Sequence, residues 1–136
     1  MKLLMIYCSR FAYTPTIKVL EDAEDANSPA EQENILVAFI QAEAKDEEDL
    51  KGMEKKLVKN LKWAAGKNNT KRVMLHSFAH LSDSKASPEF TSELFDSAKA
   101  RMENAEYETF TTPFGYFLDL DMQAPGYSLA RIFKSF

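Results

Sequence analysis

The sequence is poor in the residues that support disulfide, metal and phosphate-loop chemistry. It has one cysteine, two histidines and four glycines among 136 residues. A lone cysteine excludes an intrachain disulfide framework and is typical of a reducing compartment. No stretch approaches the roughly 18 consecutive apolar residues of a membrane span, and residues 1–10 lack the length and cleavage site of a secretory signal. We therefore expect a cytoplasmic protein with no membrane contact.

The chain also lacks a strong net charge. Seventeen basic residues against 21 acidic residues give a formal charge of −4. This balance argues against a broad nucleic-acid footprint but leaves room for a local basic patch. A domain of this length buries roughly 68–70% of its unfolded surface. We therefore expect one domain over residues 1–136 that folds without a disulfide or a metal.

Short apolar runs and two helical patterns define the expected elements. Strands are predicted at residues 2–8, 10–19, 35–42, 71–76, 107–112, 117–122 and 127–133. A helix is predicted over residues 46–65, where apolar residues recur at three- and four-residue steps, and a second helix begins at Ser87–Pro88. The acidic stretch 21–34 is predicted to be a loop.

The resulting element order is β-β-β-α-β-α-β-β-β. Two strand–helix–strand passages favour parallel pairing with right-handed crossovers. The closely spaced terminal strands favour antiparallel hairpins. The predicted fold class is therefore α/β, with a mixed sheet and two helices.

Two short segments combine aromatic, small and polar residues at strand ends. They are His76–Ser82 and Pro113–Phe117. Polar residues interrupt the apolar pattern of a core strand, and the aromatic residues are too many for an ordinary turn. An apolar wall, a few polar groups and a glycine are what a small-molecule pocket needs. We interpret the two segments as parts of one pocket.

Nucleophilic and metal chemistry each have one candidate set. Cys8 with His76 or His80 is either a reactive thiolate with its base or a small buried cysteine with two polar histidines. No third orienting group is evident, which favours the second interpretation. His76, His80 and Asp83 form either a metal site or a hydrogen-bonded loop, and the absence of a further Cys/His cluster favours the loop.

Charged residues offer two further alternatives. Asp119 and Asp121 lie on one face of a strand and are either an acid–base pair or a solvated face. The main basic cluster contacts phosphates or forms the solvated side of the first helix. This cluster comprises Lys55, Lys56, Lys59, Lys62 and Lys67. Trp63 adjoins the apolar stripe of that helix, and we expect it in the core.

With its motifs placed in order, the chain resembles the archaeal-type editing domain of threonyl-tRNA synthetase, which shares the fold of D-aminoacyl-tRNA deacylase. The matching features are Leu3–Ile6, Ile35–Ile40, Phe78–Ser82, Pro113–Tyr116, and Gly126 followed by Leu129 and Ala130. Their order and spacing run the length of the chain. The Phe-Ala-His-Leu-Ser and Pro-Phe-Gly-Tyr pieces are specific together, although either alone is a weak signal.

The resemblance implies removal of serine wrongly attached to threonine tRNA. In this family, backbone groups and the terminal ribose hydroxyl of the tRNA assist an attacking water, without a metal or another cofactor. The implied partners are the tRNA 3′ end, a second copy of the chain in a homodimer, and a threonyl-tRNA synthetase in trans.

The resemblance also assigns site residues. The catalytic positions are Phe78, Ala79 and His80, which act through backbone groups and by orienting the substrate. The substrate-binding positions are Ala42, Phe114, Gly115, Tyr116, Phe117 and Arg131.

Several positions depart from the family pattern. The family has His-Ser-Asp where this chain has Tyr7–Ser9, and a valine where Ala42 predicts a larger pocket. It has a tyrosine and then a functional lysine where this chain has Phe117 and Leu118. It has an acidic residue at Arg131, which is instead expected to meet a phosphate or carboxylate.

Three functions follow from this pattern. The first is an aminoacyl-tRNA deacylase in which Phe78–His80 hold the ester and Ala42 sets the size of the pocket. The second is a binding module for an amino-acid-like or nucleotide-like ligand, suggested by Leu118 and Arg131. The third is an interaction module that acts with a synthetase.

Overall fold

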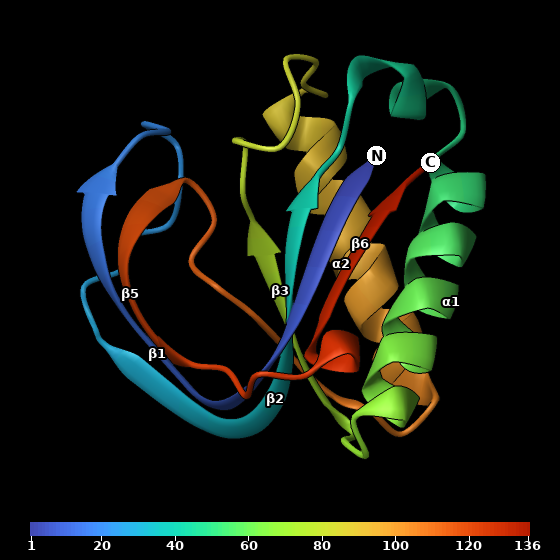
Figure 1. The fold of residues 1–136 in the computed structure, drawn as a ribbon. Helices are drawn as coiled ribbons and strands as arrows, with labels where there is room; N and C mark the ends of the chain where they lie inside the picture. Colours follow the sequence, from blue (N-terminus) through green and yellow to red (C-terminus); the bar gives the residue numbers. More distant parts are fainter.

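A curled, six-stranded mixed sheet organises the chain, and the computed structural model describes residues 1–136 (Figure 1). The strands are β1 (Lys2–Lys18), β2 (Ala30–Gln41), β3 (Arg72–Ser77), β4 (Glu108–Thr111), β5 (Tyr116–Gln123) and β6 (Arg131–Ser135). The helices are α1 (Leu50–Lys67) and α2 (Pro88–Asn104), with short 3-10 turns η1 (Ala44–Glu48) and η2 (Ser128–Ala130). The predicted α/β fold class is confirmed.

Strand pairing combines both directions. The order is β4-β3-β2-β1-β5, and β6 also pairs with β1. The β2–β3 and β3–β4 pairs are parallel, whereas every partner of β1 is antiparallel to it. On one side, β1 pairs first with β6, over Lys2–Ile6, and then with β5, over Arg10–Lys18. Residues 7–9 therefore lie between two successive partners.

The first two predicted strands form one continuous strand, β1. Pro15, which lies within the second predicted strand, is placed where the β1–β5 register shifts. The β1–β2 ladder ends at the pair Tyr13 and Ala30, so Pro15 lies beyond it and leaves no hydrogen bond of that ladder unmade. The same pairing corrects the predicted loop 21–34, because its last residues belong to β2.

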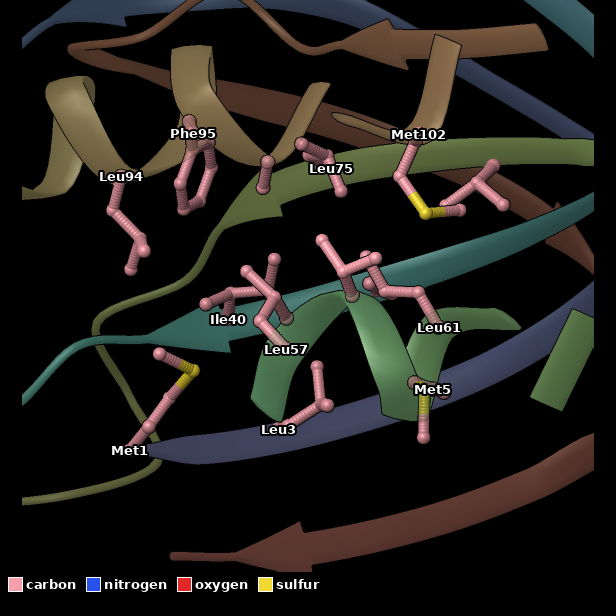
Figure 2. Packing of buried hydrophobic residues seen from close by; sticks show 14 of the residues in the cluster. Met1, Leu3, Met5, Ile40, Leu57, Leu61, Leu75, Leu94, Phe95 and Met102 are labelled. Atoms are coloured by element: carbon pink, nitrogen blue, oxygen red, sulfur yellow. The ribbon is translucent and has the colours of Figure 1, made fainter. Parts of the chain in front are cut away.

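Both helices cover one face of the sheet. Figure 2 shows Leu3 and Met5 of β1, Leu57 and Leu61 of α1, and Phe95 of α2 gathered in this layer. The other face carries a smaller buried cluster: Cys8, Phe11, Ile35, Val37, Phe39 and Met74. None of the helices has the length and apolar character needed to cross a membrane.

Helix boundaries follow local chemistry. The Asp49 side chain accepts a hydrogen bond from the backbone N–H of Gly52, so α1 begins later than predicted and η1 occupies the preceding turn. Ser87 caps α2 and Pro88 takes its first position, as predicted. The parallel strands β2 and β3 end at the same edge of the sheet, where the site lies.

Candidate functional site

A cavity of about 430 Å³ opens at the ends of β2 and β3. It brings together the two segments singled out in the sequence. The predicted residues that line it are Ala42, Phe78, Ala79, His80, Phe114, Gly115, Tyr116 and Phe117. Its volume lies in the range of small-ligand pockets. We call residues 78–84 the loop wall and residues 113–117 the turn wall.

Gln41, the last residue of β2, fixes the loop wall. Its Nε2 donates to the carbonyl oxygens of Ser82 and Ser84, both at 2.8 Å. Its Oε1 accepts from the amides of Leu81 at 2.7 Å and Ser82 at 2.8 Å. The Gln41 side chain is buried, and all four hydrogen bonds hold the backbone that follows His80. Sequence reasoning missed this residue.

A buried ion cluster lies beside Gln41. The amino-terminal ammonium of Met1 is 2.7 Å from Glu43 Oε1 and 3.0 Å from Asp46 Oδ2. The other oxygen of Glu43 accepts from Ser82 Oγ at 2.7 Å, which links the cluster to the loop wall. Hydrogen bonding to the ammonium, opposed by burial and aided by Ser82 and Lys2, lowers the Glu43 pKa to about 2.

Backbone amides of the loop wall differ in availability. The Phe78 N–H donates to the carbonyl oxygen of Ile40 at 3.0 Å, so it is committed to the fold. The amides of Ala79 and His80 have no hydrogen-bond partner within the chain. The backbone donors expected at Phe78–His80 are therefore restricted to these two residues.

His76 is a buried, neutral component of the cavity wall. Its Nδ1 lies 2.9 Å from Thr112 Oγ1, and its ring meets Phe39 edge to face at 5.1 Å between centroids. Burial lowers the His76 pKa to about 4. The imidazole is therefore uncharged at neutral pH and shapes the cavity without adding charge.

His80 connects the two walls. Its ring centroid lies 4.9 Å from that of Phe78 and 6.4 Å from that of Phe117, with nearly parallel planes in the second pair. The His80 side chain is exposed at the cavity mouth. Contacts with the two aromatic rings orient the imidazole at the place where a ligand would enter.

The turn wall depends on backbone conformation. Gly115 has φ +85°, and a Cβ atom there would lie 2.7 Å from the Ala23 Cβ. Its carbonyl oxygen accepts from the Val19 amide at 2.8 Å, and the Tyr116 hydroxyl accepts from the Ala26 amide at 3.0 Å. These bonds attach the connection after β1 to the turn, and only glycine fits the conformation without strain.

Charged groups are placed differently from the expectation. Arg131 is exposed on β6, donates from Nη1 to the Pro125 carbonyl oxygen at 2.8 Å, and does not line the cavity. Leu118 lines it and contributes no charge. Lys85 also lines the cavity, where it is the one residue with a permanent charge. Lys85 lies in a polar loop without a motif, so no sequence signal identified it.

The other candidate chemistries find no support. Burial raises the Cys8 pKa to about 11, and this residue lies outside the cavity. No group of three or more histidine, cysteine or acidic side chains is placed to hold a metal ion. Asp119 and Asp121 are exposed, and Asp121 pairs with Arg10 at 2.9 Å. These two aspartates form a solvated face.

Comparisons with known proteins converge on one family. A family model described as the Archaea-specific editing domain of threonyl-tRNA synthetase matches residues 1–136. The threonine–tRNA ligase of Nitrosopumilus maritimus is 30% identical over 136 residues, covering 98% of this chain and 21% of that protein. The corresponding ligase of Methanopyrus kandleri is 26% identical, covering 99% and 22%. The chain thus spans about a fifth of the length of these relatives.

A solved structure agrees in fold over its whole length. The c-Myc DNA unwinding element binding protein matches with a TM-score of 0.68 at 12% sequence identity, covering 99% of this chain and 98% of that one. At this identity, the likeness concerns the fold alone. It supports the mixed α/β arrangement described above.

Proposed function

Because the chain belongs to the Archaea-specific editing domain family of threonyl-tRNA synthetase, we propose that it hydrolyses the ester of a mischarged tRNA. Serine on threonine tRNA is the first substrate to test. Threonine and serine differ by one methyl group, which gives only a small difference in binding free energy. A second, size-selective site is therefore useful. The observation that carries the proposal is the cavity between the two walls, where the unpartnered amides of Ala79 and His80 adjoin an imidazole.

The proposed step uses water as the nucleophile. The water oxygen forms a bond to the ester carbonyl carbon, and the bond from that carbon to the ribose oxygen breaks. The ribose oxygen takes up the proton that the water gives up, which releases a free amino acid and an uncharged tRNA. The amides of Ala79 and His80 stabilise the developing oxyanion, while the His80 ring orients the terminal ribose.

Size and charge are assigned to other parts of the cavity. Ala42 sets the depth available to the amino-acid side chain, and Phe114 and Tyr116 of the turn wall position the aminoacyl group. Lys85, in place of the expected lysine, meets a phosphate of the tRNA 3′ end. Arg131, which is outside the cavity, has no contact with the substrate in this scheme.

Release of amino acid from a panel of aminoacyl-tRNAs tests the proposal. We expect hydrolysis above the uncatalysed rate for serine on threonine tRNA. His80→Ala should lower the rate by about 10²-fold, the order typical of a lost positioning contact. Lys85→Gln should raise KM with little change in kcat. Folded protein that releases no amino acid from any member of the panel contradicts the proposal.

We propose that the chain acts in the cytoplasm as a homodimer, beside a threonyl-tRNA synthetase. Family membership supports the synthetase context. The mass of the chain in solution tests the dimer, and a monomer at micromolar concentration rules it out. Co-purification tests the synthetase, and recovery of the chain without one counts against that partner.

A binding function without catalysis is favoured by two observations. No acidic residue lines the cavity, and Leu118 replaces the expected lysine. A thermal-shift screen of amino-acid and adenosine analogues tests this alternative, because a ligand of the native state raises the unfolding temperature. A stabilising ligand that is not turned over supports it, and hydrolysis of any aminoacyl-tRNA refutes it.

A further inference from the structure

Helix α1 presents a basic surface away from the core. Lys56, Lys59, Trp63 and Lys67 follow one another at steps of three and four residues, so they lie along one line of the helix. All four are exposed. Lys134 of β6 joins them from the neighbouring edge of the sheet. We call these five residues the α1 surface.

Trp63 lies at the centre of this surface, contrary to the predicted core position. Its side chain remains 43% exposed. The Lys67 ammonium lies 5.8 Å from the indole ring centroid and the Lys134 ammonium 5.4 Å from it. A large exposed ring flanked by cations is the combination that stacks a nucleic-acid base while neighbouring charges meet phosphates.

The charges of the α1 surface have no partners within the chain. None of its lysines is within 4.0 Å of a carboxylate. The one acidic residue of α1, Glu54, is directed to Arg101 of α2 at 3.7 Å. Some basic residues elsewhere are paired, as Lys18 is with Asp25 and Lys99 with Glu103, whereas no lysine of the α1 surface is. Positive charge is therefore left free at this surface.

We infer that the α1 surface binds the phosphate backbone of an RNA, with Trp63 as a stacking platform. Lysine is depleted at protein–protein interfaces, whereas it is the common neutralising contact to phosphates. These preferences favour RNA over an acidic protein. Naming tRNA as the RNA rests on the proposed function. The basic and aromatic groups themselves specify only a polyanion with stacking bases.

The distance between the α1 surface and the cavity indicates how long a ligand that contacts both must be. Lys56 and Lys67 are eleven residues apart, which is about 16 Å along a helix. In Figure 1, α1 lies on the opposite side of the molecule from the tip formed by β1 and β5, which carries part of the cavity wall. A ligand that occupies both places must extend well beyond its terminal nucleotide, as a tRNA body does.

Binding of uncharged threonine tRNA, measured at several salt concentrations, tests the inference. The double variant Lys59→Gln with Lys134→Gln should weaken binding about tenfold, and should reduce the slope of log affinity against log salt by about 1.4–1.8. The matched control is Lys71→Gln with Lys99→Gln, which removes two lysines outside the surface. Equal affinity and slope in the two double variants overturn the inference, as does a wild-type chain that does not bind tRNA at low salt.

Two further measurements identify the partner. Trp63→Ala should weaken tRNA binding, while Trp63→Phe, which keeps a stacking ring, should retain most of it. Polyglutamate should compete poorly with tRNA. If it competes as well as an equally charged RNA, the surface binds acidic protein and the inference is wrong.

The test does not depend on catalysis in the cavity. It uses uncharged tRNA, so it is insensitive to hydrolysis, and the two substituted lysines, Lys59 and Lys134, lie outside the cavity. Absence of deacylation together with surface-dependent binding would remove the proposed hydrolysis and leave the α1 surface in place. Deacylation with unchanged binding in the lysine variants would do the opposite.

Discussion

The two walls of the cavity are held by different kinds of interaction. Side chains hold the loop wall, where Gln41 makes four hydrogen bonds and Glu43 ties Ser82 to a buried ammonium. Backbone shape holds the turn wall, where Gly115 adopts φ +85° and its carbonyl oxygen anchors the connection after β1. The stability of the loop wall should therefore depend on pH and on polar substitutions. The turn wall should respond to steric change alone.

The largest effect is expected from Gln41→Ala. This change leaves the amides of Leu81 and Ser82 and the carbonyl oxygens of Ser82 and Ser84 without their hydrogen-bond partner. We expect the free energy of unfolding to fall by about 3 kcal/mol. Urea unfolding and deacylation together measure it. We expect a loss of activity larger than the stability loss explains, since His80 lies on the released loop. Intact activity in a destabilised variant contradicts the positioning role.

Gly115→Ala should disturb the turn wall by about 1–3 kcal/mol, because φ is positive and the new Cβ approaches Ala23. The cost should be the same at pH 7 and pH 4, since no titrating group is involved. Gly126→Ala is a matched control, because nothing lies within 4 Å of a Cβ there. Equal losses in the two variants would show that the conformation of Gly115 is unimportant.

Acid should weaken the loop wall through Glu43. Its folded pKa of about 2 lies below the ordinary value of 4.5. The stability it contributes is therefore complete above about pH 4.5 and is lost as the pH falls toward 2. Glu43→Gln should lower the free energy of unfolding by about 1–2 kcal/mol at pH 7. It should also make the stability less dependent on pH between 4.5 and 2.

His76 titrates in a higher window, so the two contributions are separable. Its folded pKa of about 4 lies below the ordinary 6.5. The protein should therefore lose stability as the pH falls from 6.5 to 4, because the unfolded chain binds the proton more readily. Unfolding measured from pH 7 to pH 2 resolves both limbs. A Glu43→Gln variant with an unchanged limb below pH 4.5 rules out the assigned role of the ion cluster.

Phe117→Ala should have the smallest effect on stability, within about 0.5 kcal/mol, because its ring is 51% exposed. It removes the stack on His80 and opens the junction between the walls. We expect a higher KM for aminoacyl-tRNA, which steady-state kinetics would detect. Phe117→Tyr should behave as the wild type. Equal KM values for all three proteins would show that the stack on His80 does not contribute to substrate binding.

Sequence reasoning located the cavity but not what supports it. Phe78–His80 and Phe114–Phe117 belong to contiguous motifs, and the structure brings both segments together. Gln41 and Glu43 were missed because their partners lie about forty residues away, and a polar residue at the end of an apolar strand gives no sign of that distant contact. Lys85 was missed because it lies in a polar loop without a motif.

Trp63 was misplaced for a different reason. Helical periodicity places it beside the apolar stripe, but burial also requires a neighbouring element to cover it. The adjacent strand β6 is a five-residue edge strand and presents Lys134 instead of an apolar side chain. Periodicity describes a single helix, whereas exposure depends on tertiary neighbours.

Because β1 pairs first with β6 and then with β5, we expect the sheet to bend most easily between the two partners. Tyr7 and Cys8 stay paired with β2 on one side, while the ladder on the other side passes from one strand to the next. Bending concentrated there moves the β1–β5 tip, and with it the turn wall, relative to the helix-covered half. Amide hydrogens of this short stretch should then exchange faster than those of the same strand on either side. The width of the cavity mouth would follow the curvature of a single strand.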